Sequence, residues 1–221
     1  MIDFSFYKKL IRYQLFSRHK YGHGVHSPFV YRLITDVFRD KTRYADYKSI
    51  KKIRCELLKN RQKITVTDFG AGSKTTNIQE PTIRSIVKHS SVRARYGKLL
   101  YRLVKYFKPP LIIELGTSVG MSTLYLAKAN PEAKIHTIEG CPEKASVAHR
   151  IFKTIQNKNI EQHIGNFDKV LPEILKRTDT VDFVFFDGNH RKEAMQRYFS
   201  SCLKKIHNNS VFIIDDIHWS E

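Results

Sequence analysis

The sequence predicts an α/β fold, in which a doubly wound parallel sheet follows a helical N-terminal region. From Lys98 onward, five short and almost wholly apolar segments alternate with amphipathic segments, which is typical of parallel strands with helices on both faces. The length of 221 residues is enough for one substantial domain with an appendage. We therefore expect a helical region over 1–97, with loops that cover or line a binding site, and a sheet domain over 98–221.

The first region begins its most regular helix near Ser27. A hydroxyl residue followed by Pro28 is a typical helix start, because the hydroxyl caps free amides and proline suits the first turn. Apolar residues then follow at helical spacing: Phe29, Val30, Leu33, Ile34, Val37 and Phe38. A shorter apolar stripe includes Ile50, Ile53 and Leu57, and the polar segment 73–82 is expected to be a loop.

The second region begins with an amphipathic helix over 98–107, which Pro109 and Pro110 end. Strands are then expected over 111–115, 134–139, 160–165, 181–187 and 210–216. Helices are expected between them, over 121–129, 143–156, 169–176 and 191–206. Ligands of such sheets bind at the carboxyl ends of the strands, so the functional residues are sought there.

Composition limits the partners and the compartment. The formal net charge of +18, from 39 Lys+Arg against 21 Asp+Glu, would attract nucleic acid, an anionic membrane or an acidic substrate. The basic residues are dispersed, which also fits a plain solubilising surface. No apolar run is long enough for a membrane span. Three distant cysteines indicate reduced thiols and favour the cytoplasm.

Two glycine loops follow apolar runs, at 70–72 and at 116–120. Only the second is followed by a credible helix, whose amides and dipole can face an anionic group. It is also followed, 23 residues after Gly116, by Glu139 at a strand end. A carboxylate about 20 residues downstream can accept hydrogen bonds from ribose hydroxyls. We assign cofactor binding to the second loop and expect the first to be a lid or acceptor-binding loop.

Five segments carry a family resemblance: "LIIELGTSVGMSTLYLA", "IHTIEGCPE", "IGNFDKVLPEI", "VDFVFFDGNH" and "FIIDDIHW". Together, residues 111–216 resemble the class I S-adenosylmethionine-dependent methyltransferases, in the branch of catechol O-methyltransferase and bacterial small-molecule O-methyltransferases. The resemblance implies a Rossmann-like sheet, the cofactor S-adenosylmethionine and a small-molecule methyl acceptor. The family sheet ends in an antiparallel strand pair that is not seen here. We therefore expect either a C-terminal truncation, or an edge at 211–214 that the N-terminal region or a partner such as a second copy covers.

The resemblance also implies cofactor-binding residues. The loop after the first strand would hold the methionine part, Glu139 the ribose, and the turn after the third strand the adenine. The corresponding residues are Glu114, Gly116, Thr117, Ser118, Gly120 and Ser122 for the first loop, and Gly165, Asn166 and Phe167 for the turn. Glu139 could instead be a surface acid, and Phe167 a core residue.

Metal-dependent relatives bind a divalent ion through acids at the fourth and fifth strand ends, which here are Asp187 and the pair Asp215 and Asp216. Relatives have Asp-Asn in place of that pair, so the second position departs from the pattern. Oxygen ligands suit Mg²⁺, whereas without a metal these acids would raise one another's pKa. The alternative is that Asp187 and Asp215 only orient the cofactor and a loop.

His190 stands where metal-dependent relatives have a lysine. An imidazole can accept the proton of an acceptor hydroxyl, and together with Asp187 this residue is the catalytic candidate. It could equally contact metal or substrate, or cap the following helix. The other concentration of imidazoles, at His19, His23 and His26, suits a loop near the active site better than a zinc site.

Two alternative functions stay open. The positive charge also suits an RNA methyltransferase, although no Asn-Pro-Pro-Tyr-type motif is present. A non-catalytic module is the other alternative, with a basic, aromatic N-terminal helix lying on an anionic membrane through Phe4, Tyr7, Leu10 and Ile11.

Overall fold

The computed structural model describes residues 26–67, 80–155 and 158–217. The chain divides into two compact units, Met1–Thr42 and Arg43–Glu221. In the first unit, α2 (Pro28–Arg32) continues into a π-helical stretch, η2 (Leu33–Phe38). The predicted start is confirmed, because the Ser27 hydroxyl accepts the amide of Val30 at 3.4 Å. The predicted regular helix is not maintained over its full length.

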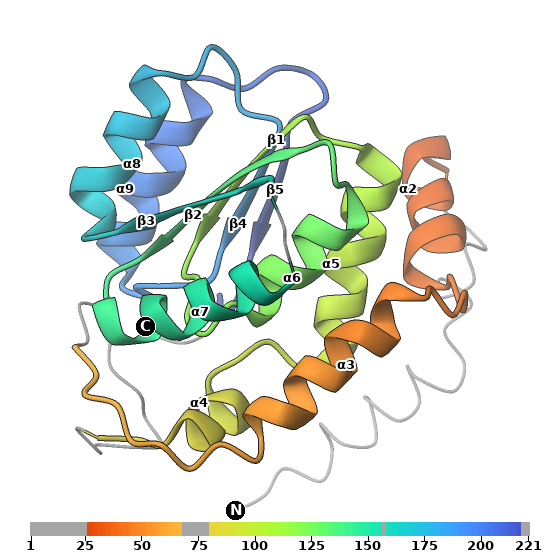
Figure 1. The fold of residues 1–221 in the computed structure, drawn as a ribbon. Coiled ribbons are helices and arrows are strands. Elements are labelled where there is room, and N and C mark those ends of the chain that lie inside the picture. Colours follow the sequence, from red (N-terminus) through yellow and green to blue (C-terminus); the bar gives the residue numbers. More distant parts are fainter. Residues whose placement is uncertain (1–25, 68–79, 156–157, 218–221) are drawn as a thin grey trace, which may run out of the picture. The chain divides into compact units, whose positions relative to one another are not determined.

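The second unit is built on a five-stranded parallel sheet, as the sequence predicted (Figure 1). The strand order is β3-β2-β1-β4-β5. The strands are β1 (Leu111–Leu115), β2 (Lys134–Glu139), β3 (Ile160–Ile164), β4 (Phe183–Phe186) and β5 (Val211–Ile214). The order reverses at β1, so the crevice beside its carboxyl end is the expected ligand site of a doubly wound sheet.

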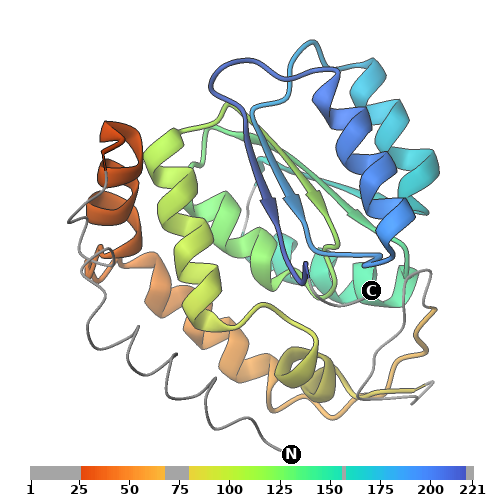
Figure 2. The same cartoon turned by 180° about the vertical axis from the view of Figure 1, so that it is seen from behind.

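Helices cover both faces of the sheet (Figures 1 and 2). One face carries α8 (Phe167–Lys176) and α9 (Lys192–Leu203), and the other carries α5 (Ala94–Phe107), α6 (Met121–Ala129) and α7 (Pro142–Thr154). Two further helices, α3 (Asp46–Leu57) and α4 (Ile83–His89), belong to the same unit, and α3 contacts α6. No helix in the described ranges is both long and apolar enough to cross a membrane.

The apolar core explains why these strands read as nearly continuous hydrophobic segments. Ile113, Leu115 and Ile138 face α8 and α9 in one buried cluster, together with Val184 and Phe186. Neighbouring positions such as Ile112 and Ile135 are also fully buried. A strand that is buried on both faces cannot show the apolar–polar alternation of a half-exposed strand.

The predicted sequence of strands and helices is confirmed, with boundaries that shift by a few residues. The helix expected from Lys98 begins at Ala94 and ends, as expected, before the two prolines, with Lys108 in a left-handed conformation. The expected division before Lys98 therefore falls inside α5. The alternation of apolar and amphipathic segments starts just before the first strand, whereas the compact unit that contains the sheet already begins at Arg43.

Arg54 of α3 provides a test of how this helical layer is held. Its guanidinium donates to the carbonyls of Val87, at 3.0 Å, and Val92, at 2.8 Å, and so connects α3 to the end of α4 and the segment after it. We expect Arg54→Met to lower stability by about 2 kcal/mol because two partly buried carbonyls lose a charged donor. Thermal unfolding should show a decrease in Tm of roughly 4–8 °C.

Lys51→Met on the same helix is the matched control, since Lys51 is exposed. It should leave Tm unchanged within about 1 °C, because isolated surface charges contribute little. Equal decreases for both variants would mean that the guanidinium hydrogen bonds do not stabilise this layer.

Candidate functional site

The candidate site lies at the carboxyl edge of the sheet, where acidic side chains stand near or just after the ends of four neighbouring strands. Glu114 and Glu139 belong to β1 and β2, whereas Asp187 and Asp215 directly follow β4 and β5. Parallel register brings these positions to one edge, because Glu114 pairs with Phe185 and Phe186 pairs with Ile214. The sheet topology therefore gathers negative charge at one place in a chain whose net charge is +18.

The pKa of Asp187 shows the effect of this negative charge. The pKa of its carboxyl is raised well above the ordinary value, first by burial and then by the negative charges of Asp215, Glu114, Asp216 and Glu139. Each of these acids is therefore close enough to oppose ionisation of the Asp187 carboxyl. A cation placed here would relieve that repulsion.

The backbone of the loop after β1 lies close to the carboxyl edge of the sheet. Gly116 has a φ of 111°, Ser118 of 48° and Gly120 of 84°, so three of five consecutive residues occupy a region that favours glycine. A Cβ on Gly116 would lie 2.1 Å from the carbonyl oxygen of Asp187, so the loop backbone touches the end of β4. No residue with a side chain could replace Gly116 without moving backbone.

Glu139 holds this loop against β2. Its carboxylate accepts the amide of Ser118 at 2.7 Å and the amide of Cys141 at 2.9 Å. The side chain is nearly buried, but each carboxylate oxygen has lone pairs beyond these bonds. The sequence alternative, a surface acid, does not describe this position.

Glu114 is fully buried and connects the first turn of α6 to β2 through hydrogen bonds. Its Oε2 accepts the hydroxyls of Thr123, at 2.5 Å, and Thr137, at 2.6 Å, and the Thr137 hydroxyl also pairs with that of Thr117. Burial raises the pKa of the Glu114 carboxyl, and nearby hydroxyls, including that of Ser122, oppose the rise. Thr117 and Ser122 are buried too. These side chains reach a ligand less directly than the backbone of the loop does.

Two buried oxygen atoms of the site, Glu114 Oε1 and Ser118 Oγ, have no hydrogen-bond partner within the described ranges. Buried polar atoms are nearly always paired in folded proteins, because an unpaired one loses its hydration without compensation. Their position beside the glycine loop is consistent with a site that a polar ligand completes.

The turn after β3 also reaches this edge. Gly165 has a φ of 151° and donates its amide to the carbonyl of Glu139 at 2.9 Å. The Asn166 side chain caps α8 by accepting the amide of Asp168 at 2.8 Å. Phe167 lies in the core with its ring edge-to-face on Tyr198, at a centroid distance of 5.8 Å.

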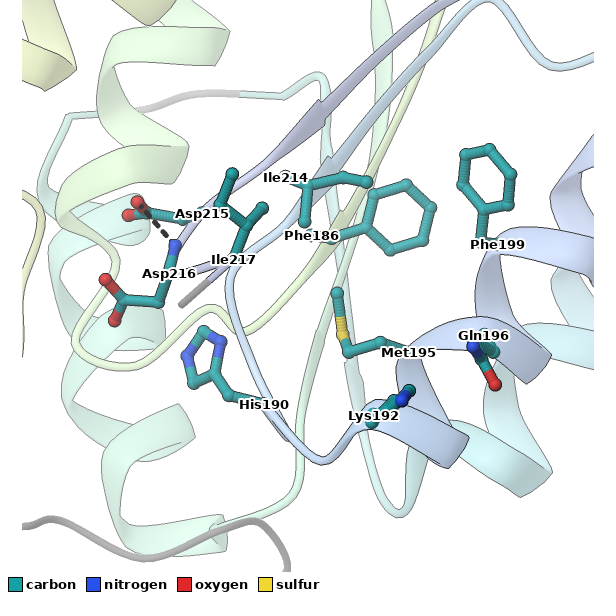
Figure 3. Close-up of a pocket in the computed structure, with 10 residues that line it drawn as sticks. All are labelled: Phe186, His190, Lys192, Met195, Gln196, Phe199, Ile214, Asp215, Asp216 and Ile217. Atoms are coloured by element: carbon teal, nitrogen blue, oxygen red, sulfur yellow. Dashed lines mark hydrogen bonds between the residues drawn. The ribbon is translucent and has the colours of Figure 1, made fainter. Parts of the chain in front are cut away.

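A cavity of about 400 Å³ opens beside the ends of β4 and β5. Figure 3 shows His190, Asp215 and Asp216 in its polar part, and Phe186, Met195 and Phe199 in its apolar part. The remaining lining residues are Lys192, Gln196, Ile214 and Ile217. The cavity thus joins an imidazole and two carboxylates to an apolar chamber.

Sequence reasoning identified the polar part of this cavity but missed its apolar wall on α9. The spacing of Lys192, Met195, Gln196 and Phe199 is helical, and this pattern could have indicated a shared face. The first glycine loop, with Gly70 and Gly72, lies outside the described residues. His19 and His23 lie outside them as well, while His26 is exposed.

Comparison with known proteins identifies the sheet region. A family model described as a methyltransferase domain matches residues 113–217. The match covers a little under half of the 221-residue chain. It confirms the resemblance carried by the five sequence segments, and the glycine loop, Asp187 and Asp215 all lie inside the matched range.

Two curated relatives of the chain are O-methyltransferases by name. The "probable O-methyltransferase" of Mycobacterium tuberculosis is 32% identical over 130 residues, which are 55% of each chain. The catechol O-methyltransferase of Niastella koreensis is 27% identical over 130 residues, 58% of each chain. The chain thus spans little more than half the length of the curated relatives it matches.

A solved structure shows the same fold. The O-methyltransferase TomG of Streptomyces achromogenes, solved in complex with S-adenosylmethionine, superposes with a TM-score of 0.56 and 23% identity. The superposition covers 84% of this chain and 77% of that one. The predicted Rossmann-like fold is therefore confirmed.

The sheet domain should be more stable without the Asp187 charge. Since the pKa of Asp187 is raised in the folded state, the folded chain binds this proton more tightly than the unfolded chain, and stability falls as pH rises above about 4 through the raised pKa. Asp187→Asn removes that loss. At pH 7.5, in EDTA and without cofactor, we expect the variant to gain about 1 kcal/mol or more, seen as a Tm higher by roughly 2–4 °C.

The gain should shrink as the pH falls through the raised pKa of the folded state and should be lost below about pH 3, where the wild-type carboxyl is protonated in both states. Asp179→Asn is the control for loss of an exposed carboxylate and should leave Tm unchanged. A variant at Asp187 that is less stable than wild type at pH 7.5 would show that the carboxylate makes a favourable contact, contrary to this account.

Proposed function

We propose that the chain is an S-adenosylmethionine-dependent O-methyltransferase that acts on a hydroxyl group of a small molecule. The observation that carries the proposal is the closure of the glycine loop onto Glu139 beside an acidic edge. The names of the curated relatives support transfer to oxygen. The cavity of about 400 Å³ supports an acceptor of small size, because a pocket of this volume suits a compact organic molecule.

The charge and shape of the site fit this cofactor. S-adenosylmethionine carries positive charge on its sulfur and amino group, and the edge offers the acids that, after burial, raise the pKa of Asp187. The backbone at Gly116, Thr117, Ser118 and Gly120 can approach the methionine part closely. The unpartnered Ser118 Oγ is available to a polar group of the ligand.

The remaining cofactor contacts follow from the strand ends. The free lone pairs of Glu139 can accept the two ribose hydroxyls, in the manner of an acid at the end of the second strand. The turn of Gly165, Asn166 and Phe167 would border the adenine. Glu114 and Ser122 would support the loop from within the protein, because both side chains are buried.

A divalent metal also fits the site. Asp187, Asp215 and Asp216 offer oxygen ligands, and the pKa of Asp187 is raised by its burial and by the charges of the neighbouring acids, which a cation would offset. Mg²⁺ prefers such oxygen ligands. A bound ion would polarise the acceptor hydroxyl and make its proton easier to remove.

His190 is placed to manage the acceptor's proton. It lines the cavity together with Asp215 and Asp216, and its imidazole can accept a proton from an acceptor hydroxyl held there (Figure 3). The acceptor oxygen gains the methyl group, the bond from sulfur to that carbon breaks with its electron pair on sulfur, and the hydroxyl proton passes to the imidazole. The protein's part is to align the oxygen with the methyl group and to exclude water.

Cofactor binding can be tested at Glu139. We expect Glu139→Ala to weaken binding of S-adenosylhomocysteine by about 100-fold, because both the ribose contacts and the clamp on Ser118 are lost. Isothermal titration of the wild type, of this variant and of Glu132→Ala would measure it. Glu132 is an exposed acid and its variant should bind as the wild type does. Failure of the wild type to bind either S-adenosylmethionine or S-adenosylhomocysteine would contradict the proposal.

Substitution of His190 should lower the rate of catalysis without changing cofactor binding. With a panel of hydroxylated aromatic acceptors and radiolabelled cofactor, His190→Ala should lower kcat by about 100-fold or more while the Kd for S-adenosylhomocysteine stays within twofold. His149→Ala, at an exposed histidine of α7, is the control and should keep full activity. Unchanged kcat in His190→Ala would exclude proton transfer through this imidazole.

A further inference from the structure

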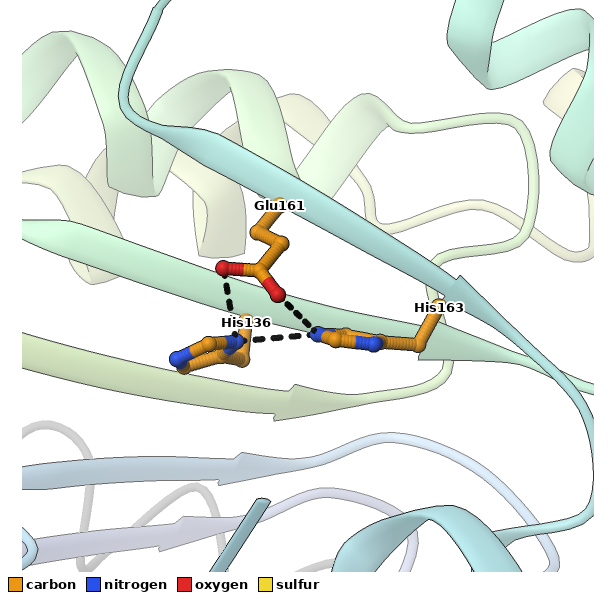
Figure 4. A group of neighbouring side chains, drawn as sticks. All are labelled: His136, Glu161 and His163. Atoms are coloured by element: carbon orange, nitrogen blue, oxygen red, sulfur yellow. Dashed lines mark hydrogen bonds and ion pairs between the residues drawn. The ribbon is translucent and has the colours of Figure 1, made fainter. Parts of the chain in front are cut away.

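A second group of metal-ligating side chains lies away from the candidate active site, on β2 and β3. His136 belongs to β2, and Glu161 and His163 belong to β3, the edge strand of the described sheet. One ligand atom from each residue lies within 4.8 Å of the others. Figure 4 shows the carboxylate and the two imidazoles pointing toward one another between the two strands.

The parallel register explains this convergence. His136 is the direct partner of Glu161, and Ile138 is the partner of His163, so all three side chains lie on the face that Ile138 shares with α8. Side chains of partner and alternate residues stand on one face at short separation. The group is therefore fixed by two strands rather than by mobile loops.

The spacing of the ligand atoms suits a small tetrahedral ion. His136 Nδ1 lies 2.9 Å from His163 Nε2, Glu161 Oε2 lies 3.6 Å from His136 Nδ1, and Glu161 Oε1 lies 3.5 Å from His163 Nε2. Bonds of about 2.0–2.2 Å from zinc to nitrogen and oxygen place tetrahedral ligands about 3.3–3.5 Å apart. The observed separations lie on either side of that value, so rotation of the two rings and of the carboxylate would bring one oxygen and two nitrogens to it.

Hydrogen bonds within this group do not satisfy all of the facing nitrogen and oxygen atoms. One N–H can lie between the two imidazole nitrogens, whereas the carboxylate oxygens also approach both of these nitrogens. Burial is the largest cause that lowers the pKa of His136 and of His163, which favours neutral rings with a free lone pair. Lys134 Nζ, 3.2 Å from Glu161, balances the carboxylate in part, but the lysine is 62% exposed and can turn into solvent.

We propose that His136, Glu161 and His163 form a binding site for a zinc-type divalent ion, with water as the fourth ligand. Two imidazoles and one carboxylate are typical zinc ligands, whereas Mg²⁺ prefers oxygen ligands alone. The bound ion joins the edge strand β3 to β2, about 10 Å along β2 from Glu139. It therefore stabilises the two strands that lead to Glu139 and to the turn at Gly165, without itself reaching the cofactor loop.

The test uses the metal-free chain with millimolar MgCl₂ present throughout, so that the carboxylate edge is already supplied with a hard cation. Titration with Co²⁺ should give the intense visible absorption bands of a tetrahedral ion with nitrogen ligands, and Zn²⁺ should displace them. Zinc at about a hundred times its Kd should raise Tm by roughly 5 °C or more.

Three variants assign the effect to this group. His163→Ala and Glu161→Gln should each weaken zinc binding at least tenfold and abolish the cobalt bands, and both side chains are exposed enough for the fold to tolerate the change. His149→Ala is the control for loss of a histidine and should bind zinc as the wild type does. Zinc binding and cobalt bands that survive in both variants, or no binding by the wild type, would overturn the proposal. Binding of S-adenosylhomocysteine, measured in the same samples, tests the proposed function separately.

Discussion

The whole site depends on the parallel alignment of β1, β2, β4 and β5, which forces their carboxyl ends to a single edge. Acids at these ends lie close to one another, and their negative charges add to the effect of burial in raising the pKa of Asp187. The fold accepts this repulsion although it lowers stability. Functional sites commonly retain such charges because a ligand, once bound, offsets the repulsion.

The glycine loop and Glu139 make this edge specific for a ligand with a defined shape. The backbone at Gly116 touches the end of β4, and the amide of Ser118 is held by Glu139. The loop is thus ordered by neighbouring strands before any ligand arrives, which reduces the entropy lost on binding. The acidic edge then favours a cation, while the total charge of the chain favours anions elsewhere on its surface.

Much of this could be predicted from the sequence because the signals are local. The strand and helix alternation follows from apolar periodicity, and Gly116, Glu139, Asp187 and Asp215 stand at strand ends that the pattern marks. The group of His136, Glu161 and His163 was not predicted, because it depends on the register between two strands, which the sequence does not display. The apolar wall of the cavity on α9 likewise required the packing of that helix against β4 and β5.

The two proposed metal sites also differ in chemistry, and this difference distinguishes the roles that we propose for them. The carboxyl edge offers oxygen atoms beside the reacting groups, whereas the β2–β3 group offers two nitrogens within the sheet.

A crystal structure of the chain with S-adenosylhomocysteine and Mg²⁺ tests the central claim most directly. The account predicts density for the ligand along residues 116–120, with ribose hydroxyls within hydrogen-bond distance of the Glu139 carboxylate. Ligand density elsewhere, or a Glu139 side chain turned away from the ribose, would contradict it.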